Sequence, residues 1–158
     1  MEFSGSHRIA APRAAVWAAL NDPEVLRQCT PGCQEVVQVS PTEFTAKMVL
    51  KIGPMKVAFA GNVTLTELDP PASCRIVGEG QGGVAGFAKG SSLVRLDEEG
   101  EETVLTYRTE AKVGGKIAQL GARLIDGTVK KLTGEFFAAF AAVVVPVPQP
   151  AEGAAGEA

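Results

Sequence analysis

Few side chains in this 158-residue sequence could do chemistry, and none has an evident partner. His7 is the only histidine, and it could either donate a hydrogen bond to a ligand carbonyl or simply pack. Cys29 and Cys33 are separated by three residues, one more than in a redox CxxC motif, and no further ligands nearby complete a four-ligand zinc site. No carboxylate pair or activated nucleophile stands out. We therefore predict no catalytic and no metal-binding residues, and we interpret the cysteine pair as part of a structural turn.

Glycine is concentrated in residues 78–90, between two segments that alternate like strands. Six glycines in thirteen residues leave little side chain to pack, which is typical of bends, bulges or a hollow under a sheet. A phosphate-binding loop would lead into a helix, whereas Gly86–Gly90 leads into a further strand pattern. Lys89 within the run is either a solvated lysine or a partner for an acidic protein or lipid head group.

The composition favours one domain and excludes some classes of function. The net charge is −3 and the lysines and arginines form no run, which argues against a nucleic-acid-binding surface. Three cysteines make no even disulfide set, and we find no signal peptide and no apolar stretch long enough to span a bilayer. We expect a cytoplasmic protein with reduced thiols.

Apolar spacing and turn residues predict a strand, two short helices, six further strands and a long final helix. The first strand is expected at 2–9, the short helices at 12–20 and 23–28, and the other strands at 34–39, 43–51, 56–68, 73–80, 84–96 and 103–113. Short breaks between consecutive strands predict antiparallel pairing.

Apolar residues recur at helical spacing from Gly115 to about Val145, which predicts one amphipathic helix lying across the sheet. Gly121, Gly127 and Gly134 inside it each cost about 1 kcal/mol relative to alanine, a cost that close packing or bending would explain. Phe137 falls off the apolar face and is either an ordinary surface aromatic or a contact for a membrane or partner. Residues 146–158 are rich in proline, alanine, glycine and glutamate and are predicted to be a disordered tail.

These elements predict an α+β fold of the START-like or helix-grip kind, a curved antiparallel sheet of about seven strands around a long C-terminal helix, with two short helices after strand 1. Because a strongly bent sheet touches the helix over only part of its length, the space between them can remain an apolar pocket. The side chains expected to line it are one histidine and several large apolar residues: His7, Phe87, Leu120, Leu124, Leu132, Phe136 and Phe140.

Several segments in order, among them Leu20–Pro23, Cys29–Cys33, Gly86–Gly90 and Gly114–Gly121, closely resemble the G-subunit family of carbon monoxide dehydrogenase. The resemblance covers roughly residues 2–143, so residues 1–145 are taken as one domain. It implies a START-like accessory protein encoded with a molybdenum hydroxylase of the carbon monoxide dehydrogenase type, distinct from the subunits that carry molybdenum, flavin or iron–sulfur centres.

The resemblance also implies a cavity for a lipid-like molecule such as a quinone, no covalently bound cofactor, and peripheral contact with the inner face of the membrane. Three functions follow as hypotheses. The first is a non-enzymatic carrier that presents an apolar ligand to the hydroxylase. The second is an assembly factor that recruits the hydroxylase or a maturation partner, with the cavity incidental. The third is a small cyclase or hydrolase that depends on His7.

Overall fold

Alternation along the strands gives one sheet an apolar inner face and a polar outer face. Phe44, Val57 and Phe59 are buried, whereas the residues on either side of each are exposed. The structure is a computed structural model and describes residues 1–144. In chain order its elements are β1 (Glu2–Ile9), α1 (Arg13–Leu20), α2 (Pro23–Cys29), β2 (Cys33–Ser40), β3 (Glu43–Ile52), β4 (Met55–Asp69), β5 (Ser73–Gln81), η1 (Gly83–Ala85), β6 (Phe87–Glu99), β7 (Glu102–Gly114), η2 (Ala118–Leu120) and α3 (Ala122–Val144).

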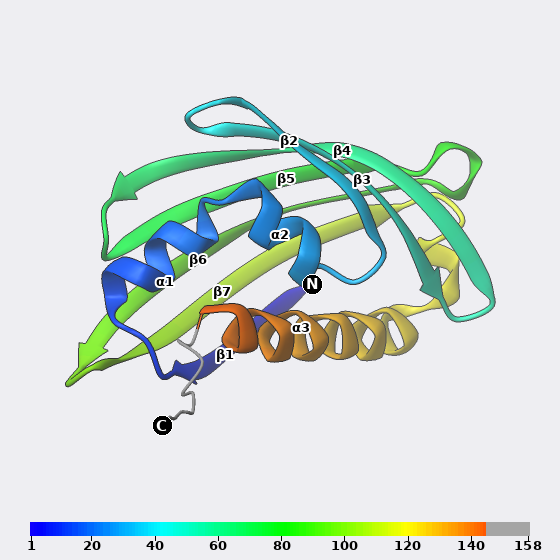
Figure 1. Ribbon diagram of the computed structural model, residues 1–158. Helices are drawn as coiled ribbons and strands as arrows, with labels where there is room; N and C mark the ends of the chain where they lie inside the picture. The colour runs from blue at the N-terminus through cyan, green and yellow to red at the C-terminus, as the bar shows by residue number, and fades with distance from the viewer. Residues whose placement is uncertain (145–158) are drawn as a thin grey trace.

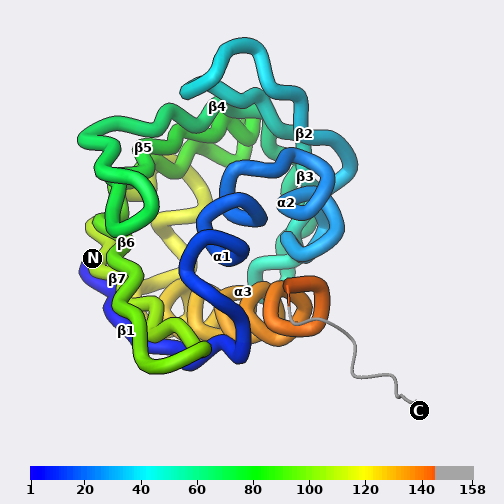
Figure 2. The backbone as a smooth tube through the Cα atoms, turned by 60° about the vertical axis from the view of Figure 1, so that its left-hand side comes forward, coloured from blue at the N-terminus to red at the C-terminus, as the bar shows by residue number. Residues whose placement is uncertain are grey.

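The seven strands form a single antiparallel sheet in the order β1-β7-β6-β5-β4-β3-β2. The sheet curls around α3, and α1 and α2 lie across one end of the resulting trough (Figure 1; Figure 2). Each strand from β2 to β7 pairs with its neighbours in sequence, and β1 joins the far edge beside β7. The predicted strands and their antiparallel pairing are confirmed.

Both short helices begin as the sequence predicts. Pro12 stands at the N-terminal cap of α1, and the side chain of Asp22 caps α2 by accepting a hydrogen bond of 2.9 Å from the backbone N–H of Glu24. Pro23 occupies the first turn of α2, where its missing N–H costs nothing. The helix ends at Cys29, one residue beyond the predicted end.

The long helix is shorter at its start than predicted. It begins at Ala122 rather than at Gly115, because Gly121, which follows η2, has a φ of 96° that lies outside the helical region. Ile117 and Leu120 therefore precede the helix and do not belong to its apolar face. The predicted end at Val145 and the predicted disordered tail lie outside the described residues.

The glycine-rich segment forms a tight turn and two flanking strands. β6 begins at Phe87 rather than at the predicted residue 84, because η1 and Gly86 make the turn first. Gly86 has a φ of 119°, and a side chain there would collide with the backbone carbonyl of Gly114. Only glycine allows the turn to lie this close to the end of β7.

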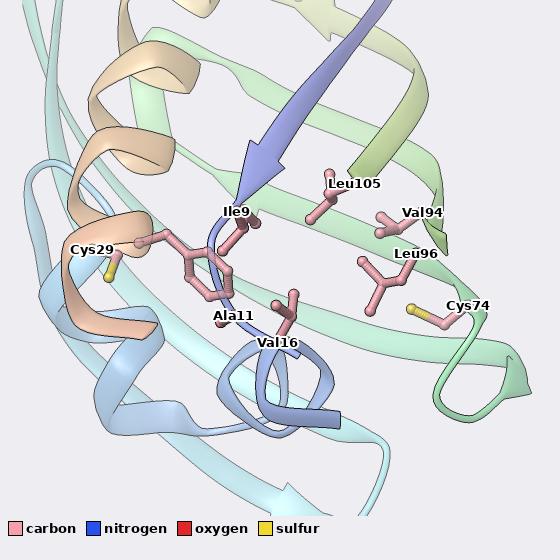
Figure 3. Close-up of a cluster of buried hydrophobic side chains, with 9 residues drawn as sticks. Ile9, Ala11, Val16, Cys29, Cys74, Val94, Leu96 and Leu105 are labelled. Atoms are coloured by element: carbon pink, nitrogen blue, oxygen red, sulfur yellow. The ribbon is translucent and has the colours of Figure 1, made fainter. Parts of the chain in front are cut away.

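The hydrophobic core is divided between the two ends of the trough. The first cluster joins α1, α2 and the C-terminal part of α3 to the sheet (Figure 3), and consists of Ile9, Ala11, Val16, Cys29, Cys74, Val94, Leu96, Leu105 and Phe140. The second cluster joins the N-terminal part of α3 to the opposite end of the sheet, and consists of Ile52, Val57, Phe59, Ala85, Ile117 and Ile125. The middle of α3, between Ile125 and Phe140, belongs to neither set of buried residues.

Two glycines within α3 are not required by its packing. Gly127 and Gly134 are exposed, and an added Cβ at either position would meet no atom within 4 Å. Close packing, one of the two explanations expected from the sequence, is therefore wrong for these positions.

Replacing Gly127 or Gly134 by alanine should raise the melting temperature by about 2–4 °C each, because alanine is about 1 kcal/mol more favourable than glycine inside a helix. Thermal unfolding followed by circular dichroism measures this. Gly121→Ala is the matched control and should lower the melting temperature, since its φ of 96° strains any other residue. A lower melting temperature for both Gly127→Ala and Gly134→Ala would contradict this, because it would show that the two glycines stabilise the folded protein.

Candidate ligand-binding cavity

A cavity of about 470 Å³ lies between the inner face of the sheet and α3. It occupies the stretch between the two core clusters, with the middle of α3 on one side and α2 with the loop after it closing part of another. Its walls contain no charged side chain and are formed by Leu20, Leu26, Thr30, Pro31, Cys33, Val36, Phe44, Ala46, Met48, Leu50, Val63, Leu65, Ile76, Ser92, Val94, Leu105, Tyr107, Thr109, Leu132, Thr133, Phe136 and Phe137. The volume falls within the range of about 300–1,000 Å³ typical of ligand pockets.

Besides Thr30 and Thr133 elsewhere on the wall, a group of hydroxyl-bearing side chains interrupts the apolar wall on β6 and β7. Thr109 Oγ1 donates a hydrogen bond of 2.8 Å to Ser92 Oγ, and the two residues are partners across the strands. Tyr107 lies two residues before Thr109 on the same inner face. These side chains can donate to or accept from a neutral polar group, so the cavity combines a largely apolar interior with a small polar spot on β6 and β7.

Tyr107 fits against the sheet because its partner on β1 is a glycine. Gly5 and Tyr107 are paired between β1 and β7, and a Cβ on Gly5 would lie only 2.7 Å from the phenol oxygen. The absent side chain lets the tyrosine ring lie over the backbone of β1. This position holds the ring at the edge of the cavity.

An aromatic stack supports the helical wall of the cavity. The ring centroids of His7 and Phe137 are 4.0 Å apart with nearly parallel planes, and Tyr107 lies beside both rings, at 5.7 Å from Phe137 and 6.2 Å from His7. Phe136 meets Phe137 edge-on at 5.1 Å. The prediction that Phe137 falls off the apolar face is wrong, because β1 curls far enough around α3 to cover that side of the helix.

His7 lies next to the cavity wall and not among the lining residues. It is half-buried, and burial lowers the pKa of its imidazole below the ordinary value of 6.5. The stacked neutral ring therefore acts in the structure as a support for Phe137.

The stability of the protein should decrease as the pH falls through about 6.5, where the unfolded chain takes up a proton that folded His7 resists. His7→Phe keeps a stacking ring without the titratable group and should remove this part of the pH dependence, as measured by denaturant unfolding at several pH values. Because the chain has one histidine, NMR titration follows His7 alone. A pKa at or above 6.5 would contradict the assignment.

The structure brings together only part of the predicted lining. Leu132 and Phe136 line the cavity, whereas Phe140 is completely buried in the first core cluster. Leu120 and Leu124 pack against the second cluster, because the helix starts later than predicted and they lie near its first turn. Whether any of these residues binds a ligand stays a prediction.

Phe87 lies on the outer face of the sheet, so its predicted place in the wall is wrong. Strand alternation puts it on the same side as Lys89, whose ammonium lies 5.9 Å from the centre of the phenyl ring, and opposite to Ser92. The ring covers Gly114, where a side chain would collide with it. Gly78 and Gly90 of the glycine-rich run also do not line the cavity; they border a groove of about 580 Å³ outside the sheet.

Sequence reasoning missed the contribution of β7 and of the loop after α2. Leu105 alternates with Tyr107 and Thr109 along one strand, and this spacing was a usable signal that all three face inward. Thr30 and Pro31 carried no comparable signal, because loop residues have no periodicity from which to assign a face.

The cysteines are free thiols. Cys33 lies on the cavity wall, Cys29 and Cys74 are buried in the first core cluster, and burial raises the pKa of all three. Protonated thiols are poor nucleophiles and poor metal ligands. Within residues 1–144 no three histidine, cysteine or acidic side chains gather as a metal site. Among the same residues, no helix combines the length and hydrophobicity that a bilayer span requires.

Comparison with solved structures identifies the class of fold. The chain is 28% identical to a conserved protein from Geobacillus kaustophilus, with 91% of this chain and 95% of that one covered and a TM-score of 0.86. A START superfamily protein from Mycobacterium smegmatis (13% identity, 90% and 96% covered, TM-score 0.69) and the Zhui aromatase/cyclase from Streptomyces sp. R1128 (14%, 91% and 93%, 0.64) share the fold. The architecture is therefore that of a START-like protein.

The family follows from the sequence. Residues 5–145 match the family model of CoxG, the G subunit of carbon monoxide dehydrogenase, and the chain belongs to this family. Comparison with curated protein sequences finds no match. The expected family and fold are both confirmed.

Proposed function

We propose that the protein is a non-catalytic carrier that encloses one neutral, lipid-like molecule and serves a molybdenum hydroxylase of the carbon monoxide dehydrogenase type. The observation that carries the proposal is the apolar cavity of about 470 Å³ under α3. Membership of a family described as a subunit of carbon monoxide dehydrogenase supports the choice of client.

The absence of charge from the cavity wall favours a neutral ligand. An ionised carboxylate or phosphate enclosed there would lose its hydration without gaining a counter-charge, at a cost of several kcal/mol. A quinone presents carbonyl oxygens, which can accept hydrogen bonds from donors such as the hydroxyls of Tyr107 and Ser92, and its isoprenoid chain suits the apolar remainder. Fatty acids and phospholipids fit less well, because their head groups are charged.

Burial can supply enough free energy for useful but reversible binding. Enclosing about 300 Å² of isoprenoid surface would contribute roughly 7 kcal/mol at about 25 cal/mol per Å², before the cost of ordering the ligand is subtracted. The net value corresponds to binding in the micromolar range or weaker. Such an affinity suits a carrier, which must release its ligand to the client.

The position of His7 favours a carrier over a small cyclase or hydrolase. A catalytic role would require the imidazole to reach the substrate, yet the ring stacks against Phe137 and does not line the cavity. No second acid or base is present on the walls, where the titratable groups are a thiol and a phenol.

Ala46→Trp should abolish binding of an apolar ligand, because residue 46 lies on the inner face of β3 and the indole would occupy the cavity. Thr45→Trp is the matched control, one residue away on the exposed face. The measurement is mass spectrometry of lipids extracted from each protein after expression in cells that make quinones, followed by titration with a short-chain quinone and with palmitate. We expect the unmodified chain and Thr45→Trp to bind the quinone at least tenfold more tightly than palmitate.

Ala46→Phe makes a smaller intrusion and keeps the test valid where the tryptophan variant fails to fold. In a pull-down from quinone-deficient cells, failure of the unmodified chain to retain the hydroxylase supports a carrier whose contact with the hydroxylase depends on the ligand. Full retention of the hydroxylase there, with no lipid recovered from the unmodified chain, would contradict the carrier and identify an assembly factor.

A further inference from the structure

Three connections meet at the end of the molecule opposite the C-terminal end of α3. The β3–β4 turn contacts the start of α3 through Gly53 and Leu124, and the N–H of Ile117 donates to the carbonyl of Ala85 in the β5–β6 turn at 2.9 Å. Figure 1 shows these connections together at the right-hand end. We use the name basic tip for four exposed cations and one exposed apolar residue of this end, which are Lys51, Lys56, Lys116, Arg123 and Val84.

Charge is distributed unevenly between the two ends. Within residues 1–144, no carboxylate lies within 4.0 Å of the charged nitrogen atoms of the basic tip. The β6–β7 turn at the opposite end holds five acidic residues between 97 and 102, and arginines pair with several of them, as Arg8 does with Glu99 at 2.7 Å. The molecule therefore has a positive end although its net charge is −3.

Like charges are placed side by side at the positive end. Lys51 and Lys56 are directly opposite each other on β3 and β4. Like-charged residues in these positions oppose sheet formation. The folded protein therefore tolerates an unfavourable pair at this end, which an anionic surface would neutralise.

Val84 projects from the same end on a rigid support. It is 90% exposed, and the backbone hydrogen bonds Ala85 N–H to Gly82 O and Gly86 N–H to Gly83 O fix the turn that carries it. One exposed valine is ordinary by itself. At the same end as the unpaired cations, however, it is placed to enter the apolar boundary beneath lipid phosphates.

We infer that the basic tip docks the protein onto an anionic lipid bilayer, with the cations on the phosphates and Val84 inserted. Lysine supplies three of the four cations, and lysine is depleted from protein interfaces, whose centres favour aromatic residues and arginine. Diffuse attraction to a charged surface needs only cations. The inference rests on the proposed function, since a carrier of an apolar ligand collects it from a membrane.

The test is co-sedimentation of the full chain with vesicles of phosphatidylglycerol and phosphatidylcholine in equal parts, and with vesicles of phosphatidylcholine alone. We expect binding to the anionic vesicles only, with release as salt is raised to about 0.5 M. Lys51→Gln with Lys56→Gln should weaken binding about 25-fold, near fivefold per charge. Lys47→Gln with Lys131→Gln changes the net charge equally at exposed sites elsewhere and should leave binding within about twofold.

Equal weakening by the two double variants, or equal binding to neutral vesicles, would overturn the inference. The inference would also be overturned if the variant with Lys51→Gln and Lys56→Gln no longer retained the hydroxylase in a pull-down but bound vesicles normally. The tip would then bind an acidic protein. Ala46→Trp separates this proposal from the carrier function. It should bind vesicles normally even where it has lost the apolar ligand.

Discussion

The helix α3 is held to the sheet at its two ends and not in its middle, and the cavity depends on this arrangement. Phe140 anchors one end in the first core cluster and Ile125 anchors the other in the second. The interval from Ile125 to Phe140 spans about 22 Å of helix at about 1.5 Å per residue. Side chains near both ends of this interval still pack against the clusters, but between them the space under the helix is not filled, so Leu132, Phe136 and Phe137 face a cavity.

The same division of the core separates stability from ligand contact. The buried side chains of the two clusters fix the trough, whereas the lining residues on α3 are only partly buried and have few constraints on their size. The aromatic stack of Tyr107, His7 and Phe137 is the exception, because it joins β7, β1 and α3 beside the cavity. It gives this wall a defined shape where the rest is formed by adaptable aliphatic groups.

Most of the fold could be predicted from the sequence, but only part of the cavity lining could. Strands were predictable because each alternates between a buried and an exposed face and ends at glycine, proline or an acidic turn. The start of α3 was not predictable, because the apolar spacing continues through Ile117 and Leu120. Only the backbone angle of Gly121 separates these two residues from the helix. The lining was harder still, because it depends on how far the sheet bends. A helix on a flat sheet would bury one narrow stripe, and Phe137 would lie outside it; the curled sheet covers two sides of the helix and encloses Phe137 as well as Phe136.

Phe87 is a different case from the residues whose place depends on the bend of the sheet. Alternation from Val94 and Leu96 assigns it to the outer face, so the spacing, and not its aromatic character, predicts where it lies.

The size of the cavity itself argues that it is not kept dry and empty. Engineered apolar cavities destabilise proteins by about 24 cal/mol per Å³, so a sealed void of about 470 Å³ would cost roughly 11 kcal/mol. That is comparable with the whole stability of a typical domain, about 5–15 kcal/mol. The cavity here is partly open to the surface, so water can reduce that cost, and an occupant would offset it further. An occupant that binds only the folded chain would add its binding free energy to the stability, so the proposed loading would be coupled to folding.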